Sequence, residues 1–383
     1  MNKGSDFMKF NYQLPVNLIF GRGRISELGV QTANYGKRAL LVIGGGSAAK
    51  SGLLQRALGF LEASNVESVL FDGVPQNPLT SNVDEGVKLF KDHCCDVVVG
   101  IGGGSVLDTA KAIAFSAVNE GELSDYIFGL KQPEGAFPII LVPTTSGTGS
   151  EGNCFAVLTN PETKDKKSLK SSFTFAKVSI IDPELMITMP KRVIASTAFD
   201  ALAHCHEAYV SKAAQPLNEM MALYAIKLLG ENIRRVYNDP SDLDAWESVA
   251  LASTLGGMVI NIAGVGLPHA MEHPSSGLKN IVHGVGLAAL TPAIMEYNLP
   301  YAQGKYEIMA QALGGKSAAD AVDLISKLLE DIGLKVTLGE LGIQHEDIGW
   351  MSKNSLKIMK ANVDNNPRPA SETEIAALYE KCL

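Results

Sequence analysis

The sequence predicts two domains, a parallel α/β domain followed by an all-helical domain. Short apolar runs recur in the first half of the chain, and most of them lead into a loop rich in Gly, Ser or Thr and then into a helical stretch. Strands that alternate with helices in this way form parallel sheets. From about residue 191 the runs cease and long helical stretches follow. Because 383 residues exceed one typical domain, we place the two domains at residues 1–187 and 188–383.

The individual elements follow from the apolar patterns. Continuous apolar runs are typical of strands that are buried on both faces of a parallel sheet. The expected strands are residues 39–43, 67–71, 96–101, 138–142 and 178–181, with short strands in residues 8–20. The expected helices are residues 25–33, 52–64, 82–92 and 106–118 in the first domain, and 220–229, 245–262, 285–297 and 318–332 in the second.

Composition and charge exclude several classes of protein. Hydrophobic residues make up 46% of the chain and charged residues 19%, which is typical of a globular protein with large cores. The net charge of −8 and the lack of basic runs argue against nucleic acid and against an anionic membrane surface as partners. No apolar run approaches the roughly 18 residues of a membrane span, and the N-terminus does not resemble a signal peptide. The chain has five cysteines and no CxxC motif, which indicates a protein of the reducing cytoplasm. Any metal site is therefore expected to use nitrogen and oxygen ligands rather than thiolates.

Two GGGS segments are candidate phosphate loops. Each segment follows an expected strand and precedes an expected helix, where backbone N–H groups can bind an anion and glycine permits its close approach. Neither segment is a complete GxGxxG motif, and tight turns between strand and helix are the alternative explanation. The candidate cofactor residues of the two loops are Gly44, Gly45, Gly46, Ser47, Gly102, Gly103, Gly104, Ser105 and, on the following helix, Asp108.

The first loop bears on the choice of cofactor. An acidic residue after the strand would bond the ribose hydroxyls of NAD and repel the 2′-phosphate of NADP. Ile43 is followed instead by glycines, a serine and then Lys50, which favours NADP over NAD. Asp72, at the end of the next strand, is the residue that would reverse this preference. A third loop, TTSGTGS, offers Thr144, Thr145 and Thr148 to a nicotinamide or ribose, or is an ordinary polar turn.

Two histidine-rich segments predict a metal site. Asp200 and His204 are spaced i, i+4, as are His269 and His273, so each pair lies about 40° apart on one helical face. A lone histidine is more often a hydrogen-bonded core residue, but the clustering with a carboxylate favours ligands. His283 is expected to return from a new segment. Nitrogen-rich ligation with one carboxylate suits Fe²⁺ or Zn²⁺ and not Mg²⁺ or Ca²⁺.

Neighbouring residues are expected to lie outside the metal site. Pro274 and Gly277 predict a helix break between His273 and His283. His206 lies on the opposite side of its helix from His204, and Glu207 lies on a flank, where it would have a structural or outer-shell role.

At these residues the chain resembles the iron-containing (group III) alcohol dehydrogenases. The motifs occur in order along nearly the whole chain: GGGSVLDTAKA from Gly102, PTTSGTGSE from Pro143, DPEL from Asp182, DALAHCHEAY from Asp200, HAMEHPSSGLKNIVHG from His269, and NPR from Asn366. The resemblance implies a Rossmann-like dinucleotide-binding domain and a helical domain in the dehydroquinate synthase-like architecture, with the active site between them. The GGGS at Gly44 is similar to the NADP-dependent butanol dehydrogenase and aldehyde reductase branch.

The resemblance also implies roles for single residues. The metal ligands that it implies are Asp200, His204, His269 and His283. His273 would lie beside the nicotinamide and relay a proton. Cofactor contacts are implied for Gly103, Gly104, Ser105, Thr144, Thr145, Thr148 and Lys166. The family usually has an aliphatic residue where His206 stands.

The implied function is the interconversion of a primary alcohol and its aldehyde by hydride transfer with NADP or NAD. We expect Fe²⁺, with Zn²⁺ as the alternative, a cytoplasmic location and a homodimer or larger homo-oligomer. The alternatives are a glycerol dehydrogenase-like enzyme, a dehydroquinate synthase-type lyase and a non-catalytic metal-binding protein. The lyase would need more basic residues for a phosphorylated substrate than the second half offers, where Arg234–Arg235 is the one pair.

Overall fold

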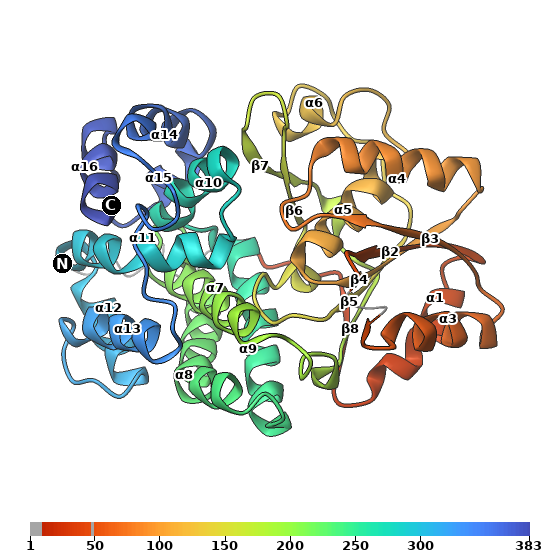
Figure 1. Ribbon diagram of the computed structural model, residues 1–383, viewed down its shortest axis with the longest axis horizontal. Coiled ribbons are helices and arrows are strands. Elements are labelled where there is room, and N and C mark those ends of the chain that lie inside the picture. The colour runs from red at the N-terminus through yellow and green to blue at the C-terminus, as the bar shows by residue number, and fades with distance from the viewer. Residues whose placement is uncertain (1–9, 47–49) are drawn as a thin grey trace. The chain divides into compact units, whose positions relative to one another are not determined.

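The computed structural model describes residues 10–46 and 50–383 (Figure 1). The chain divides into two compact units, one of Leu14–Met189 and one of Pro190–Leu383, to which the described residues 10–13 also belong. The first is an α/β unit and the second is built from helices, so the fold class expected from the sequence is confirmed.

A six-stranded parallel sheet forms the centre of the α/β unit, with the strand order β1-β8-β5-β4-β2-β3. Its strands are β1 Asn17–Phe20, β2 Arg38–Gly44, β3 Glu67–Val74, β4 Val97–Gly102, β5 Ile139–Pro143 and β8 Val178–Ile181. Every residue of β4 and β5 is buried, as the continuous apolar runs predicted. Residues 10–16, which were expected to be extended, form no regular strand.

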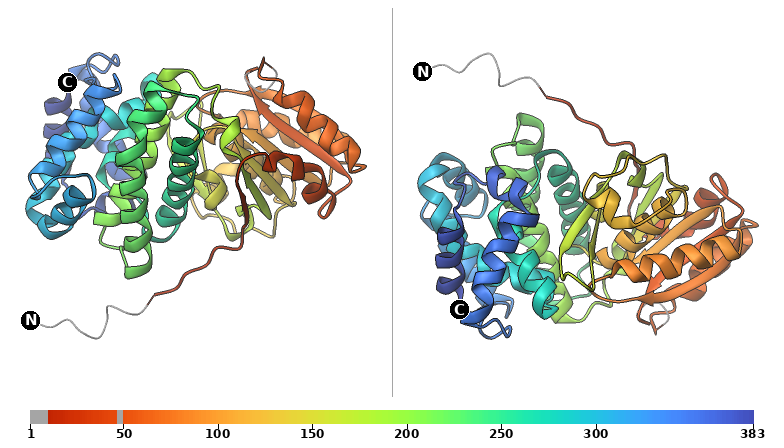
Figure 2. Two further views of the ribbon diagram at one scale, coloured as in Figure 1. Left: turned by 90° about the horizontal axis from the view of Figure 1, so that it is seen from below. Right: turned by 90° about the horizontal axis from the view of Figure 1, so that it is seen from above.

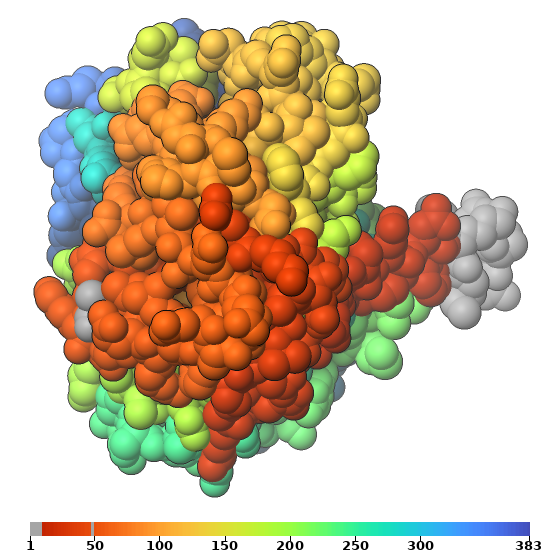
Figure 3. Space-filling view, turned by 90° about the vertical axis from the view of Figure 1, so that its right-hand side faces the viewer, coloured from red at the N-terminus to blue at the C-terminus, as the bar shows by residue number. Residues whose placement is uncertain are grey.

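Helices cover both faces of this sheet (Figures 1 and 2). They are η1 Arg24–Glu27, α1 Leu28–Ala33, α3 Leu53–Ala63, α4 Thr80–Asp92, α5 Gly104–Ser116 and α6 Leu123–Ile127. Phe90 of α4 and Phe115 of α5 belong to one core cluster, while Leu28 of α1 and Leu61 of α3 belong to another. The red and orange atoms that dominate Figure 3 belong to the N-terminal part of the described chain.

A second, two-stranded sheet was not foreseen. It is an antiparallel hairpin of β6 Phe155–Thr159 and β7 Lys166–Lys170. The sequence KKSLK of β7 contains one large apolar residue, so apolar periodicity gave no signal. Short 3-10 turns, η2 Ser150–Gly152, η3 Ser172–Thr174 and η4 Pro183–Leu185, flank this hairpin and β8.

All regular elements from Pro190 to Leu383 in the second unit are helices. Its elements are α7 Lys191–Val210, α8 Pro216–Asn238, α9 Leu243–Ala263, α10 Leu267–Lys279, α11 His283–Asn298, η5 Leu299–Tyr301, α12 Gln303–Ala312, α13 Asp320–Asp331, α14 His345–Ile358, α15 Lys360–Asn365 and α16 Glu372–Cys382. The four helical stretches expected from the sequence correspond to α8, α9, α11 and α13.

The predicted helix break at Pro274 and Gly277 is wrong. α10 continues through both residues to Lys279, and Asn280, which follows it, adopts a left-handed conformation with φ 53°. Proline removes one backbone donor from the helix, so neighbouring carbonyls need other partners. The carbonyl of Met271 accepts hydrogen bonds from Ser275 Oγ at 3.0 Å and from Tyr379 Oη at 2.5 Å. Side chains thus support the helix around the proline.

Within the described residues, no single helix is both long enough and apolar enough to cross a membrane. The consecutive helices α9 and α10 meet the length and composition criteria only when they are taken together, across a bend of 103°.

Candidate active site

Helix α7 supplies the first half of a buried polar cluster. Asp200 and His204 lie one turn apart on it, 3% and 5% exposed, as their i, i+4 spacing predicted. His206 lies apart from this cluster, and its Nε2 is 3.0 Å from Tyr306 Oη. Burial lowers the pKa of His206 to about 4, although Glu207 raises it, so the imidazole is neutral at ordinary pH.

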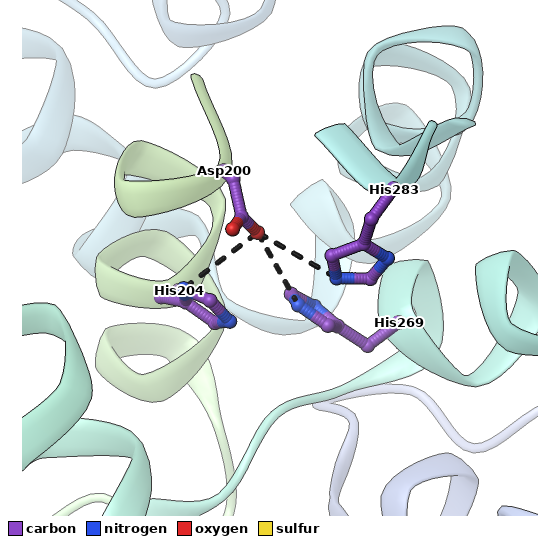
Figure 4. A group of neighbouring side chains, drawn as sticks. All are labelled: Asp200, His204, His269 and His283. Carbon is purple, nitrogen blue, oxygen red and sulfur yellow. Dashed lines mark ion pairs between the residues drawn. The ribbon is translucent and has the colours of Figure 1, made fainter. Parts of the chain in front are cut away.

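Helices α10 and α11 supply the other half (Figure 4). His269 lies in the first turn of α10, and His283 is the first residue of α11. Asp200 Oδ1 is 3.7 Å from His204 Nδ1, 3.8 Å from His269 Nε2 and 3.6 Å from His283 Nε2. One ligand atom from each of the four residues lies within 4.8 Å of the others. The structure therefore brings together the four residues that the sequence proposed as ligands.

The spacing of these atoms fits a shared cation. Four ligands at about 2.1 Å from a tetrahedral ion are separated from one another by about 3.4 Å. The observed separations of 3.6–3.8 Å are close to that value and too long for ordinary hydrogen bonds. His269 Nε2 is buried and makes no hydrogen bond, which suits a nitrogen whose lone pair binds a metal. Three imidazoles and one carboxylate are the donor set expected for Fe²⁺ or Zn²⁺.

Two further carboxylates orient the imidazoles. Glu207 Oε1 is 2.6 Å from His269 Nδ1, and Glu272 Oε2 contacts His283 Nδ1. Both glutamates are 2% exposed or less. A carboxylate on Nδ1 fixes the tautomer and directs Nε2 towards a metal. Glu207 thus has the outer position that the helix geometry indicated. The role of Glu272 was not predicted from the sequence, because neither its i, i+4 spacing to Ser276 nor its place before His273 is a metal-ligand pattern.

The carboxylates make the cluster electrostatically negative. Burial lowers the pKa of His269, but the charge and hydrogen bond of Glu207, followed by the charges of Asp200 and Glu272, raise it above the usual value. A cluster that favours a positively charged imidazole also favours a divalent cation in the same place.

His273 lies beside this cluster. Its ring centroid is 5.6 Å from that of His283 and 6.3 Å from that of His269. With Glu272 and His283 it also forms a second group of potential ligands, and it is 5% exposed. The i, i+4 pair His269/His273 is therefore divided: His269 belongs to the four-residue cluster and His273 adjoins it.

In the α/β unit, two of the predicted loops form one cradle. Thr144 N donates to Gly102 O at 2.9 Å, because β4 and β5 are neighbours. A Cβ atom at Gly103 would lie 3.2 Å from Thr145 Oγ1, and one at Gly104 would lie 2.3 Å from Thr148 Cγ2. Where α5 begins, glycine therefore avoids a clash at Gly104 and a tight contact at Gly103. The N-terminus of a helix is also where backbone N–H groups can bind a phosphate.

Other predicted cofactor residues support this cradle. Ser105 Oγ donates to Gln76 O. Asp108 accepts hydrogen bonds from Ser150 Oγ at 2.6 Å and Val157 N at 2.9 Å, and it is 7% exposed. Both of its carboxylate oxygens thus bind protein atoms, and a cofactor contact by Asp108 stays a prediction. Lys166, on β7, is 6% exposed, and its Nζ is 3.4 Å from Asn77 Oδ1.

Lys111 is a further residue of this network, and no role was predicted for it from the sequence. It is fully buried, and its Nζ lies 2.6 Å from Ser150 O, 2.8 Å from Ser150 Oγ, 3.2 Å from Asn153 Oδ1 and 2.8 Å from Phe155 O. Burial lowers its pKa to about 8 even though Asp108 raises it. Lys111 therefore anchors the end of the threonine loop and the start of the hairpin to α5.

The first glycine loop begins at the end of β2. Gly45 and Gly46 have open space around them, and Gly46 has φ 93°. Ser47 lies outside the described residues. Asp72 is exposed on β3, the strand that pairs with β2.

Comparison with known proteins identifies the family. The model of "Iron-containing alcohol dehydrogenase" matches residues 15–183, and that of "Fe-containing alcohol dehydrogenase family, C-terminal" matches residues 194–383. The chain is 39% identical to a 1,3-propanediol dehydrogenase of Klebsiella pneumoniae over 98% of this chain and all of that protein. It is 31% identical to an NAD-dependent methanol dehydrogenase of Bacillus methanolicus, over 97% and 100% of the two chains.

Solved structures agree with this identification. The structure of an archaeal halo-thermophilic alcohol dehydrogenase from a Red Sea brine pool superposes with a TM-score of 0.93, at 35% identity, over 98% of this chain and 99% of that chain. Fold and family models together define an alcohol dehydrogenase, an oxidoreductase with a dinucleotide-type α/β unit and a helical unit. The chain belongs to the iron-containing alcohol dehydrogenase family, so the resemblance stated from the motifs is confirmed.

Proposed function

We propose that this enzyme interconverts a short primary alcohol and its aldehyde, with NADP as the hydride carrier and Fe²⁺ as the resident metal. The observation that supports the metal most strongly is the position of Asp200 Oδ1, 3.6–3.8 Å from three imidazole nitrogens. Relatives named for 1,3-propanediol and methanol support a small alcohol as the substrate. Zn²⁺ is the alternative ion because it accepts the same donor set.

The geometry supports a role for each residue of the site. Asp200, His204, His269 and His283 would hold the ion, with Glu207 and Glu272 fixing two of the imidazoles. When bound, the ion would act as a Lewis acid towards the substrate oxygen, and the nicotinamide would accept or donate the hydride. The cradle of Gly102–Ser105 with Thr144, Thr145 and Thr148 would hold the cofactor, supported by Lys166.

His273 is the proposed proton relay. It adjoins the four-residue cluster, and a buried imidazole can accept the hydroxyl proton of an alcohol or return it to the product. We expect His273→Ala to retain metal while kcat falls about 10²-fold or more. Wild-type kcat in this variant would remove His273 from the mechanism.

The preference for NADP rests on the small residues after β2. The loop offers glycines and, beyond them, Lys50, with no carboxylate to repel a 2′-phosphate. Asp72 on the adjacent strand and the NAD-dependent relative make NAD the competing cofactor.

The test is a panel of C1–C4 aldehydes and alcohols with NADPH, NADH and their oxidised forms, using protein loaded separately with Fe²⁺ and Zn²⁺. We expect turnover with a short aldehyde and NADPH after Fe²⁺ loading. His283→Ala should lose the metal and turnover together. Full turnover in metal-free His283→Ala would contradict the proposal, and a higher kcat/KM with NADH would reassign the cofactor.

A further inference from the structure

A sharp turn between α9 and α10 lies just before a proposed metal ligand, His269. The two helices meet at 103°, and His269 is the third residue of α10. Gly264 has φ 65°, a left-handed conformation that favours glycine. Any rotation of this turn would move His269 relative to Asp200 and His204 on α7.

Side chains from two other elements hold the first turn of α10. Gly266 N donates to Glu207 Oε2 at 2.7 Å, and His269 N lies 3.4 Å from the same oxygen. Leu267 N donates to Asn366 Oδ1 at 3.2 Å. Residue 268 is proline and has no N–H. The N–H groups at the start of this buried helix, which have no partner within the helix, are therefore satisfied by one glutamate and one asparagine.

Asn366 is itself rigidly held. Its Nδ2 donates to Asn298 Oδ1 at 2.6 Å and to Arg368 O at 2.7 Å, while its Oδ1 also accepts from Asn298 Nδ2 at 3.1 Å. Asn298 and Asn366 are each 1% exposed. Two buried amides that bond reciprocally leave little freedom for the oxygen that Leu267 N–H contacts.

The preceding residue holds the other side of the same turn. Asn365 Nδ2 donates to Ala263 O at 2.7 Å and to Val265 O at 3.0 Å. Its Oδ1 accepts from Ala213 N at 3.1 Å, just beyond the end of α7. The dipeptide Asn365–Asn366 thus contacts the end of α9, the start of α10 and the segment after α7.

The packing of the turn leaves no room for a shift towards these side chains. A Cβ atom at Gly266 would lie 2.8 Å from Asn366 Oδ1 and 3.7 Å from Glu207 Oε2. A Cβ atom at Gly264 would lie 3.2 Å from Asn365 Nδ2. The turn is therefore pressed directly onto the two asparagines.

We propose that Asn366 is a positioning residue of the metal centre: through the backbone of Leu267 it fixes the first turn of α10 and thereby the direction of His269 Nε2. The inference rests on the proposed ligand set. The Asn366 side chain hydrogen-bonds to Leu267 N, Asn298 and Arg368 O, so its effect on His269 passes through the main chain of α10. Metal sites tolerate displacements of only about 0.5 Å, so a small rotation of α10 weakens binding.

The test compares Asn366→Ala with Asn218→Ala. Asn218 is also fully buried in the helical unit and also satisfies a helix N-terminus, since its Oδ1 accepts from Gln215 N at 2.6 Å. Each protein is loaded with Co²⁺, and its visible absorption spectrum and the rate of metal loss to EDTA are measured, with the Tm of the metal-free protein as the measure of folding.

We expect Asn366→Ala to lose metal about 10- to 100-fold faster than the wild type and to show an altered Co²⁺ spectrum. Asn218→Ala should lower the Tm of the metal-free protein without either effect. Equal metal loss and identical spectra in both variants would overturn the inference.

Gly266→Ala provides an independent test, which also serves if Asn366→Ala does not fold. The added methyl presses on Asn366 Oδ1 from the side of the turn, so the same spectral change and faster metal loss are expected. A wild-type spectrum in folded Gly266→Ala would count against the inference. If wild-type protein and His269→Ala bind Co²⁺ equally, the proposed ligand set fails instead, which separates the two conclusions.

Discussion

Glu272 lies at 0% exposure next to His283, and its second oxygen accepts from Ser276 Oγ. A fully buried carboxylate is costly unless nearby cations or donors stabilise it. An imidazole that binds a metal through its other nitrogen is such a donor. The burial of Glu272 is therefore explained if His283 is a ligand.

We expect Glu272→Gln to weaken metal binding about 10- to 100-fold, because the amide preserves volume but removes the charge that orients His283. The measurement is the dissociation constant for Fe²⁺ or Co²⁺ under anaerobic conditions. Glu151→Gln, at a glutamate of the α/β unit that is 2% exposed, is the matched control and should bind metal as the wild type does. Equal affinities in the two variants would show that Glu272 has no part in the centre.

Lys111 gives a pH dependence of stability. Its pKa is about 8 in the folded protein, against 10.5 for an ordinary lysine, because burial opposes the charge. Between these two values the unfolded chain binds more protons than the folded chain. The free energy of unfolding contributed by this group therefore rises with pH across that interval.

Compared with Lys111→Met, the wild type should gain on the order of 1–2 kcal/mol of unfolding free energy between pH 7.5 and pH 9.5. Urea unfolding at the two pH values measures this. Lys88→Met changes an exposed lysine, so its unfolding free energy should change with pH as that of the wild type does. If Lys111→Met and the wild type have parallel pH slopes, Lys111 is charged to the same extent in both states.

At the scale of elements, the close approach of α7 and α11 brings Asp200 and His283 together. A Cβ atom at Gly284 would lie 2.0 Å from the backbone oxygen of Ser196. Backbone cannot give way as a flexible side chain can, so glycine at the second residue of α11 allows the contact. His283 precedes it and is placed directly by this packing.

Gly284→Ala should therefore destabilise the protein by about 1–3 kcal/mol and also lower its metal affinity, since it forces α11 away from α7. Denaturant unfolding of the metal-free protein and metal titration measure the two effects. Gly304→Ala, also in the first turn of a helix but with open space around the position, is the control and should change neither by much. Unchanged affinity in folded Gly284→Ala would mean that this contact does not set the ligand spacing.

Element patterns explain what the sequence could and could not predict. The buried strands and the i, i+4 pair Asp200/His204 were predictable because burial and helical spacing are periodic. The continuation of α10 through Pro274 was not, because it depends on Ser275 and on Tyr379, which lies more than a hundred residues away. The charged hairpin strand β7 lacked any apolar alternation.

Across the whole molecule, the sequence predicted the fold class, the ligand candidates and the outer position of Glu207, but not the positions of Glu272, Asn298 and Asn366. Asn366 contacts Leu267 and Asn298 across long stretches of the chain, and such contacts have no local sequence pattern. The roles of the cofactor residues likewise depend on tertiary contacts: the two oxygens of Asp108 bind Ser150 and Val157.

Metal binding should raise the thermal stability of the whole protein. A ligand that binds only the folded state adds about 2.7 kcal/mol to the unfolding free energy at a free concentration of 100 Kd. The Tm should therefore rise with Fe²⁺ or Zn²⁺ and fall when a chelator is added, as followed by calorimetry. Asp200→Ala should show the same Tm with and without metal; a metal-dependent Tm in that variant would place the binding site elsewhere.

All five cysteines are free thiols, so none of them links distant parts of the chain. An ion shared by Asp200, His204, His269 and His283 would join α7 to the consecutive helices α10 and α11, which come later in the chain, as a disulfide joins distant segments in other proteins. This cross-link would differ from a disulfide in being insensitive to thiol reductants and reversible by chelators. The polypeptide would then carry no covalent cross-link. Metal supply, rather than the redox state of the thiols, would decide whether the cross-link between the helices forms.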